Sequence, residues 1–298
     1  MIVRSGDRVL VQGITGKQGT FWTEKMQAYG TNIVGGVNPK KAGTEHLGVP
    51  VFESVVEAAN QLGENGQSGV DVTVLFIPPA GARAATEDAI AAGAKLVVVL
   101  TEFIPVHDTM AMIAAANEAG TRIIGPNTAG VVTPGEAFVG FMPAFDKRIF
   151  TPGNVGVLSR SGSLGTLTAV ELTRLGIGQS AFLGIGGDPV SGTTTAEAFR
   201  ALDEDPATEA IVLIGEIGGR KEEDAAEVIA GSSKPVVSFL AGSASPPGKR
   251  MGHAGAIVDG DTGTYASKKA ALTEAGVTVV DVPWQIPAVI ADALGGAS

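Results

Sequence analysis

Short runs of apolar and β-branched residues alternate along the chain with alanine-rich segments of helical length. In the first half, strands are expected at 8–12, 32–37, 70–77 and 96–100, with helices over 19–30, 80–92 and 108–119 and a loop after the second strand. In the second half, similar apolar runs occur at 155–158, 180–185, 210–214, 235–240 and 277–280, with helical stretches between them. The runs are almost continuously apolar, which is typical of parallel strands covered by helices on both faces. The pattern predicts two parallel sheets of the α/β class.

The two series of strands are separated by residues 125–153. This segment is rich in Gly and Pro and keeps neither the helical nor the strand period. A length of 298 residues also fits two domains better than one. We therefore expect one doubly wound domain over residues 1–128 and a second over residues 129–298.

Two glycine- or serine-rich loops follow apolar runs and open predicted helices. They are Gly13-Ile14-Thr15-Gly16-Lys17-Gln18-Gly19 and Ser159-Arg160-Ser161-Gly162-Ser163. Backbone N–H groups at the start of a helix favour anions such as phosphates, and Lys17 adds positive charge in the first loop. Each loop also has a simpler interpretation: a tight turn that needs glycine at 13–19, and a serine N-cap at Ser161.

His253 is the histidine with the most informative setting. It lies in Gly252-His253-Ala254-Gly255-Ala256, between residues too small to cover its ring, and it follows Lys249 and Arg250. Nucleophilic attack on phosphorus requires a neutral ring nitrogen, while the other nitrogen donates to a carboxylate. Glu216 ends an apolar run and is the expected carboxylate, because site residues of open α/β sheets gather at the carboxyl ends of strands.

Composition narrows the classes of partner. The net charge is −10 without a basic block, which disfavours nucleic-acid binding. No stretch reaches about 18 uninterrupted apolar residues, so no membrane span is expected, and the first seven residues lack the apolar core of a secretory signal. With no cysteine, the chain has no disulfide, thiolate metal site or cysteine nucleophile. We expect a cytoplasmic protein that holds no metal of its own and that buries part of its surface against a partner, since only 17% of its residues are charged.

Five motifs, in order along nearly the whole chain, point to one family. They are Gly-Ile-Thr-Gly-Lys-Gln-Gly-Thr-Phe at 13–21, Val-Gly-Gly-Val-Asn-Pro-Lys-Lys at 34–41, Gly-Ile-Gly-Gly-Asp-Pro at 184–189, Gly-Glu-Ile-Gly-Gly at 215–219 and Gly-Lys-Arg-Met-Gly-His-Ala-Gly-Ala-Ile at 248–257. In these motifs the chain resembles the α subunit of succinyl-CoA synthetase. The resemblance implies a Rossmann-like CoA-binding domain followed by a flavodoxin-like ligase domain that carries the phosphohistidine.

The resemblance also implies a reaction and a partner. A nucleoside triphosphate phosphorylates the histidine, the phosphoryl group passes to a small carboxylic acid, and the CoA thiolate attacks the resulting acyl phosphate. ATP or GTP, together with Mg²⁺, is bound by a β subunit of the ATP-grasp class.

Residue roles follow from the matched motifs. The resemblance makes His253 and Glu216 catalytic and places phosphate at Ser161, Gly162 and Ser163. It assigns CoA contacts to Thr15, Gly16, Lys17, Gln18, Lys41, Leu100, Thr101 and Glu102.

Two departures from the family pattern concern the carboxylic acid. Members that use succinate commonly read Pro-Asn-Cys-Pro-Gly where this chain has Pro-Asn-Thr-Ala-Gly at 126–130, and they carry a tyrosine at the position of Thr166. Thr166 is therefore the expected substrate-binding position. Succinate is the main expectation, and malate or another dicarboxylate is the alternative.

Two other classes of protein are alternatives. A CoA-binding module without catalysis would need only the first domain, and His253 with Glu216 argues against it. An NAD-dependent dehydrogenase is disfavoured because the glycine spacing differs from G-x-G-x-x-G and no acidic residue stands at Val37-Asn38-Pro39.

Overall fold

The computed structural model describes residues 1–64, 68–245, 253–258 and 262–295. The chain divides into two compact units. The first contains Met1, Val3–Phe145 and Val190–Gly192, and the second contains Ile2, Asp146–Pro189 and Thr193–Ser298. The domain boundary after residue 128 stays a prediction.

The first unit is built on a mostly parallel sheet in the order β3-β4-β2-β1-β5-β6-β7. Its strands are β1 (Val9–Gln12), β2 (Ile33–Val37), β3 (Glu45–His46), β4 (Val49–Phe52), β5 (Val72–Leu75), β6 (Leu96–Val99) and β7 (Arg122–Ile124). Only the β3–β4 pair is antiparallel among the pairs that the structure describes in this sheet. The six parallel strands follow the 3-2-1-4-5-6 order of the Rossmann fold, as expected.

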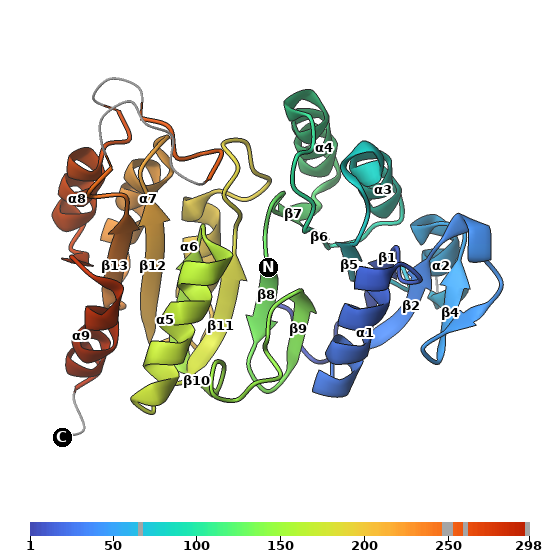
Figure 1. The fold of residues 1–298 in the computed structure, drawn as a ribbon, viewed down its shortest axis with the longest axis horizontal. Coiled ribbons are helices and arrows are strands. Elements are labelled where there is room, and N and C mark those ends of the chain that lie inside the picture. The colour runs from blue at the N-terminus through green and yellow to red at the C-terminus, as the bar shows by residue number, and fades with distance from the viewer. Residues whose placement is uncertain (65–67, 246–252, 259–261, 296–298) are drawn as a thin grey trace. The chain divides into compact units, whose positions relative to one another are not determined.

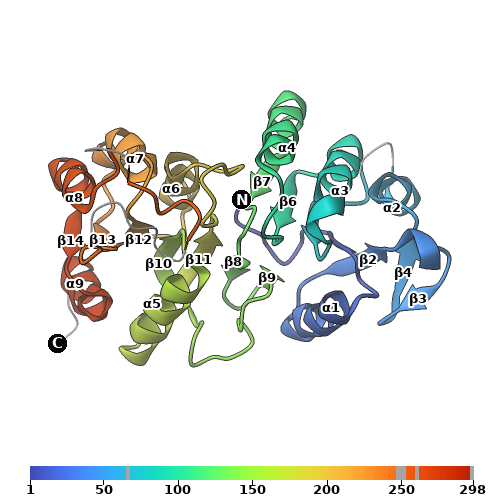
Figure 2. The same cartoon turned by 45° about the horizontal axis from the view of Figure 1, so that its top comes forward.

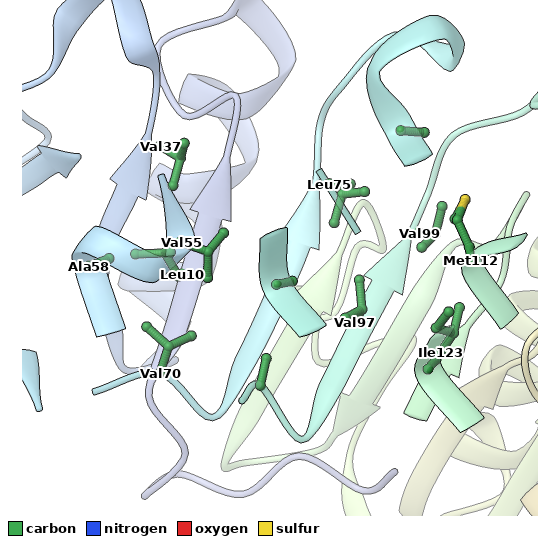
Figure 3. Close-up of a cluster of buried hydrophobic side chains, with 14 of the residues drawn as sticks. Leu10, Val37, Val55, Ala58, Val70, Leu75, Val97, Val99, Met112 and Ile123 are labelled. Carbon is green, nitrogen blue, oxygen red and sulfur yellow. The ribbon is translucent and has the colours of Figure 1, made fainter. Parts of the chain in front are cut away.

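Helices cover both faces of this sheet. They are α1 (Lys17–Tyr29), the 3₁₀ turn η1 (Pro39–Lys41), α2 (Val55–Leu62), α3 (Pro79–Ala91) and α4 (Val106–Ala119). In Figures 1 and 2, α1 lies on one face and α2, α3 and α4 lie on the other. On the second face, the strands and helices share one buried apolar cluster, in which Leu10 of β1 lies beside Val55 of α2 and Val99 of β6 lies beside Met112 of α4 (Figure 3). The continuous apolar runs of the sequence are explained by this two-sided burial.

The second unit repeats the architecture with a different strand order. Strands β10 (Pro152–Ser159), β11 (Gln179–Gly184), β12 (Ala210–Glu216), β13 (Val236–Ala241) and β14 (Thr278–Val280) lie parallel in the order β14-β13-β12-β10-β11. This is the flavodoxin-like order. Figure 2 shows α5 (Gly162–Arg174) and α9 (Ile286–Ala293) on one face, with α6 (Thr195–Asp203), α7 (Lys221–Ala230) and α8 (Tyr265–Glu274) on the other. The turn η2 (Pro283–Gln285) precedes α9.

Several elements differ from the sequence expectations. The short strands β3, β4 and β7 and the last helix α9 were not expected. Helix α2 occupies part of the stretch expected to be a loop, and its N-cap Ser54 accepts a hydrogen bond from the amide of Glu57. The segment expected to be irregular contains an antiparallel hairpin, β8 (Gly130–Thr133) and β9 (Ala137–Gly140). The hairpin belongs to the first unit, where the hydroxyl of Thr31 donates to the carbonyl of Phe138.

No helix of the described part of the chain is both long and apolar enough to cross a membrane.

Candidate active site

The candidate catalytic residues of the second unit meet where its strand order reverses. Strands β10 and β12 are neighbours, and their crossovers lead to opposite sides of the sheet. Open α/β sheets bind ligands at such a point, outside the carboxyl ends of the strands. The loop that follows β10 carries Ser161, and Glu216 is the last residue of β12.

A pocket of about 200 Å³ opens at this point. Its lining joins Ser161 and Ser163 of the first loop with Glu216 and His253; the remaining residues are Leu164, Ile217, Ala241, Gly242 and Ala256. The structure therefore brings together the predicted phosphate loop, the predicted nucleophile and its predicted carboxylate. The pocket holds one charged carboxylate and one imidazole among small or apolar side chains.

His253 lies against Glu216 with one ring nitrogen. Nδ1 is 2.8 Å from Oε2 of Glu216, although the angles at these atoms are not those of a hydrogen bond. The histidine side chain is 34% exposed, whereas that of Glu216 is 8% exposed. The Glu216 carboxylate raises the pKa of His253, and burial and Arg160 act against this increase. Because Nδ1 faces the carboxylate, Nε2 is the ring nitrogen left for a reaction.

The imidazole of His253 packs against Gly187. A methyl group built on its α-carbon would lie 2.7 Å from Nδ1 of His253 and 3.0 Å from Cγ. The carbonyl of Gly187 also accepts a hydrogen bond from the amide of Gly255, two residues beyond the histidine. The ring thus packs directly on backbone, and a larger residue at position 187 has no room. The residues of the histidine motif before His253, including Lys249 and Arg250, lie outside the described residues.

The amino terminus of α5 opens at the same pocket. Ser161 is the N-cap, and its hydroxyl accepts a hydrogen bond from the amide of Leu164. The hydroxyl oxygens of Ser161 and Ser163 are 3.3 Å apart. The capping interpretation of Ser161 is therefore correct, and it is compatible with anion binding, because the amides of the first helical turn have no partner within their own helix.

A buried arginine was missed by the sequence analysis. The side chain of Arg160 is 2% exposed, and its Nη2 lies 3.1 Å from Oε1 of Glu216. Behind it, Glu222 and Lys268 are fully buried and paired with each other. No periodicity or motif spacing distinguishes a buried arginine from an exposed one, so the sequence held no signal for this network.

Lys221 is a second cation near the pocket. Its Nζ donates to the carbonyl of Asp188, at 2.8 Å, in the loop that seats the histidine. Burial, with a smaller contribution from Arg160, lowers the pKa of Lys221 to about 8.

The first unit has a larger pocket, of about 520 Å³, at its own switch point between β1 and β5. Of the residues predicted to contact CoA, Gln18, Leu100 and Thr101 line it. The rings of Trp22 and Phe141 form one wall, with their centroids 6.3 Å apart. The remaining lining residues are Leu75, Phe76, Ile77 and Pro78.

The other predicted CoA contacts are not among the residues that line this pocket. Gly16 is the exposed N-cap of α1, and Lys17, Lys41 and Glu102 are also exposed. Thr15 is half-buried and its hydroxyl accepts a hydrogen bond from the side chain of Asn38.

Steric contacts within the first unit explain why two positions of the first loop are glycine. A side chain at Gly13 would strike the backbone of Phe76 at 2.4 Å, and one at Gly19 would strike Gly13 at 2.2 Å. The tight-turn interpretation therefore accounts for Gly13 and Gly19. It does not account for Gly16, where an added methyl group would meet only the carbonyl of Gly13, at 3.2 Å.

Thr166 is not among the residues that line the histidine pocket. It is half-buried on α5, one turn beyond Gly162, and its hydroxyl donates to the carbonyl of that residue at 2.8 Å. Its role in binding a carboxylic acid stays a prediction.

Comparisons with known proteins match both halves of the chain. Residues 5–103 match the model of the CoA binding domain, and residues 158–278 match that of the CoA-ligase family. The chain is 50% identical to a succinate–CoA ligase [ADP-forming] α subunit of Archaeoglobus fulgidus over 99% of each chain. It is 43% identical to the malate–CoA ligase α subunit of Methylorubrum extorquens over 97% of each chain.

A solved structure shares the fold. ATP citrate lyase from Methanothrix soehngenii superposes with a TM-score of 0.85 at 24% identity, covering 98% of this chain and 51% of that one. The identity of half the residues over nearly the full length, together with both family models, settles the relationship: the chain belongs to the family of CoA-ligase α subunits that includes those of the succinate–CoA ligases.

Proposed function

We propose that this chain is the α subunit of a nucleoside-triphosphate-dependent succinate–CoA ligase and that it carries the phosphoryl group on Nε2 of His253. The observation that supports this most directly is the approach of Nδ1 to Glu216 at 2.8 Å, in a pocket shared with the amino terminus of α5. The carboxylate orients the ring and compensates the positive charge that the ring acquires when Nε2 forms a bond.

In the first step, the lone pair of neutral Nε2 attacks the terminal phosphorus of the nucleoside triphosphate. The P–N bond forms, the bond to the bridging oxygen breaks, and the nucleoside diphosphate leaves. Glu216 stabilises the resulting phosphoimidazolium. The amides at the start of α5, near Ser161 and Ser163, lie in the same pocket and can hold the phosphoryl oxygens.

In the second step, a carboxylate oxygen of the acid attacks the phosphorus, and the P–N bond breaks. The acyl phosphate is released from a ring that is neutral again. In the third step, the thiolate of CoA attacks the acyl carbon, and inorganic phosphate leaves. The sequence of steps is reversible because each one transfers a group between nucleophiles.

CoA fits the first unit. This unit has an apolar pocket with an aromatic wall, lined in part by Gln18 of α1. The N-cap of the same helix is exposed, as are the side chains of Lys17 and Lys41. This combination suits a ligand with both an apolar arm and phosphates. Leu100 and Thr101 close one side of that pocket. CoA supplies the thiol that accepts the acyl group.

The nucleotide requires a partner chain. The names of the relatives describe α subunits, and we infer a β subunit of the ATP-grasp class that binds ATP or GTP with Mg²⁺. Among the described residues of this chain, no cluster of three or more histidine and acidic side chains is arranged to hold a metal ion.

The proposal is tested with the assembled α–β enzyme, Mg²⁺ and a γ-labelled nucleoside triphosphate. We expect one acid-labile, base-stable label per α chain, lost in His253→Asn and retained in the control His107→Asn, because His107 is exposed on α4. Full turnover by His253→Asn would exclude the relay.

Malate is the second candidate acid. The relative from Methylorubrum extorquens supports it. A threonine at position 166 is also smaller than the tyrosine that the family resemblance implies for members that use succinate. Comparison of kcat/KM for the two acids distinguishes the candidates.

A further inference from the structure

Arg160 holds Glu216 from the side opposite the histidine. Its Nη2 lies 3.1 Å from Oε1 of Glu216, while Oε2 of the same carboxylate faces His253. Its Nη1 donates to the backbone carbonyls of Glu216, at 3.2 Å, and of Gly218, at 3.3 Å. One guanidinium therefore contacts both the carboxylate and the backbone of the residue that faces the ring.

A second layer of charge holds the arginine. Nη1 also donates to Oε1 of Glu222 at 3.2 Å, and the same oxygen accepts from the amide of Glu216. Lys268 of α8 pairs with the other oxygen of Glu222 and with Glu223, the latter at 2.8 Å. The side chains of Arg160, Glu222 and Lys268 are 2% exposed or less.

A buried group of charged side chains is unfavourable unless each charge has a partner of opposite sign. Removing charges from water costs several kcal/mol per ion, and only close opposite charges and hydrogen bonds offset that cost. The sign of the charge alternates at every contact from Glu216 through Arg160 and Glu222 to Lys268. A structural purpose alone would be met by apolar residues of similar volume.

We propose that Arg160 is a positioning residue: it fixes the Glu216 carboxylate with one oxygen toward His253, and it is held in register by Glu222 and Lys268. Its relevance to phosphoryl transfer rests on the proposed function. The positioning of Glu216 by Arg160 is independent of the proposed function, because it is a property of the unphosphorylated site.

The charge of Arg160 has a second effect on the ring. Glu216 attracts a proton to His253, whereas Arg160 opposes protonation. Among the described residues, Asp188 also favours protonation of the ring, and Lys221 donates through Nζ to the carbonyl of Asp188. Arg160 thereby keeps the ring closer to the neutral form in which Nε2 is nucleophilic.

The test measures the ring directly. The α chain is labelled with ¹⁵N-histidine and assembled with unlabelled β subunit, and the pH titration of His253 is followed by NMR without nucleotide. His253→Asn assigns the signal. The variants are Arg160→Met and Glu222→Gln. The control is Arg174→Met, which removes an exposed pair with Glu171 from the same helix α5.

Opposite shifts are expected. Arg160→Met removes a positive charge that opposes protonation of the ring, so it should raise the pKa of His253. Glu222→Gln removes a negative charge and leaves Arg160 to act on Glu216 alone, so it should lower that pKa. Arg174→Met should leave it unchanged. Disruption of folding does not produce shifts of opposite sign.

Two further variants keep the test decisive. If Arg160→Met does not fold, Arg160→Lys retains the charge but reaches only one of the two carboxylates, and it should show a smaller shift in the same direction. The double variant Glu222→Gln, Lys268→Met removes the second layer without changing the net charge. An unchanged ring pKa in the folded variants, or shifts of the same sign for Arg160 and Glu222, would overturn the proposal. If the ring pKa shifts as expected but His253 takes up no phosphoryl label from the nucleoside triphosphate, the result would instead count against the phosphohistidine.

Discussion

Nδ1 of His253 and Oε2 of Glu216 are 2.8 Å apart, and the carboxylate is much more deeply buried than the ring. A buried carboxylate beside a half-exposed imidazole favours the protonated ring, so the pKa of His253 lies above its ordinary value of 6.5. The relationship has two opposite consequences for pH dependence.

Stability should fall as pH rises through this titration. The pKa of His253 is higher in the folded than in the unfolded chain, so its contribution is fully present below pH 6.5 and is lost as pH rises through the raised value. The unfolding free energies of wild type and His253→Asn are measured by denaturant unfolding at intervals between pH 5.5 and 7.5. The difference between the two proteins should become smaller as the pH rises. Measurements remain below pH 8, because Lys221 titrates there in the opposite sense. A difference that grows with pH would contradict the assignment.

Phosphorylation should follow the opposite course. Nε2 is nucleophilic only in the neutral ring, so the single-turnover labelling rate should rise with pH through the same pKa. Glu216→Gln should move this limb to lower pH, because the carboxylate is the main cause of the raised pKa, and should slow labelling at the plateau by about 10²–10⁴-fold. Glu171→Gln on α5 is the control. Normal plateau kinetics in Glu216→Gln would remove this residue from the reaction.

Gly187→Ala should displace the imidazole without unfolding the chain. Its methyl group would lie 2.7 Å from Nδ1, while the backbone angles of Gly187 are outside the left-handed region. We expect a large loss of labelling with a modest change in melting temperature. Gly231→Ala is the matched control, because its methyl group would meet only the carbonyl of Val228, at 3.5 Å. Equal labelling by the two variants would show that the ring is not seated on Gly187.

CoA binding should depend on the charge of Lys17 and Lys41. Calorimetry on the double alanine variant is expected to show weaker binding and a smaller dependence on salt, since two exposed cations no longer face the phosphates. Lys147→Ala, which removes an exposed lysine of the second unit, should bind CoA normally. Unchanged affinity in the double variant would move the phosphates away from this loop.

Thr166→Tyr should shift acid preference toward succinate. The threonine hydroxyl is already bonded to the carbonyl of Gly162, so a phenol would add both volume and a free donor. The measurement is kcat/KM for succinate, malate, itaconate, glutarate and citrate with the native β subunit. A strong succinate preference in wild type that Thr166→Tyr does not alter would exclude position 166 from specificity.

Much of the fold followed from hydrophobic periodicity, because helices on both faces make the central strands continuously apolar. The elements that were missed are short. Helix α2 has eight residues, and its Ser54-x-x-Glu57 signature was the available signal. The hairpin of β8 and β9 was hidden among glycines, although Pro134-Gly135 between two apolar runs is a typical turn.

The candidate site was predicted in part for a different reason. Glu216 and His253 stand at positions where the sequence changes character: the end of an apolar strand and a run of small residues. Arg160, Glu222 and Lys268 stand among other charged or polar residues, and only their burial, which depends on the packing of α7 and α8, distinguishes them.

The buried pair of Glu222 and Lys268 joins two helices that leave the ribosome at different times. Glu222 lies on α7, whereas its fully buried cation is contributed by α8, more than forty residues later. Until Lys268 has left the ribosome, the nascent chain would have to bury Glu222 without one of its two cations, at a cost of about 3–5 kcal/mol. The carboxylate that faces His253 is therefore surrounded by its full set of buried charges only after α8 has been made and has packed against α7.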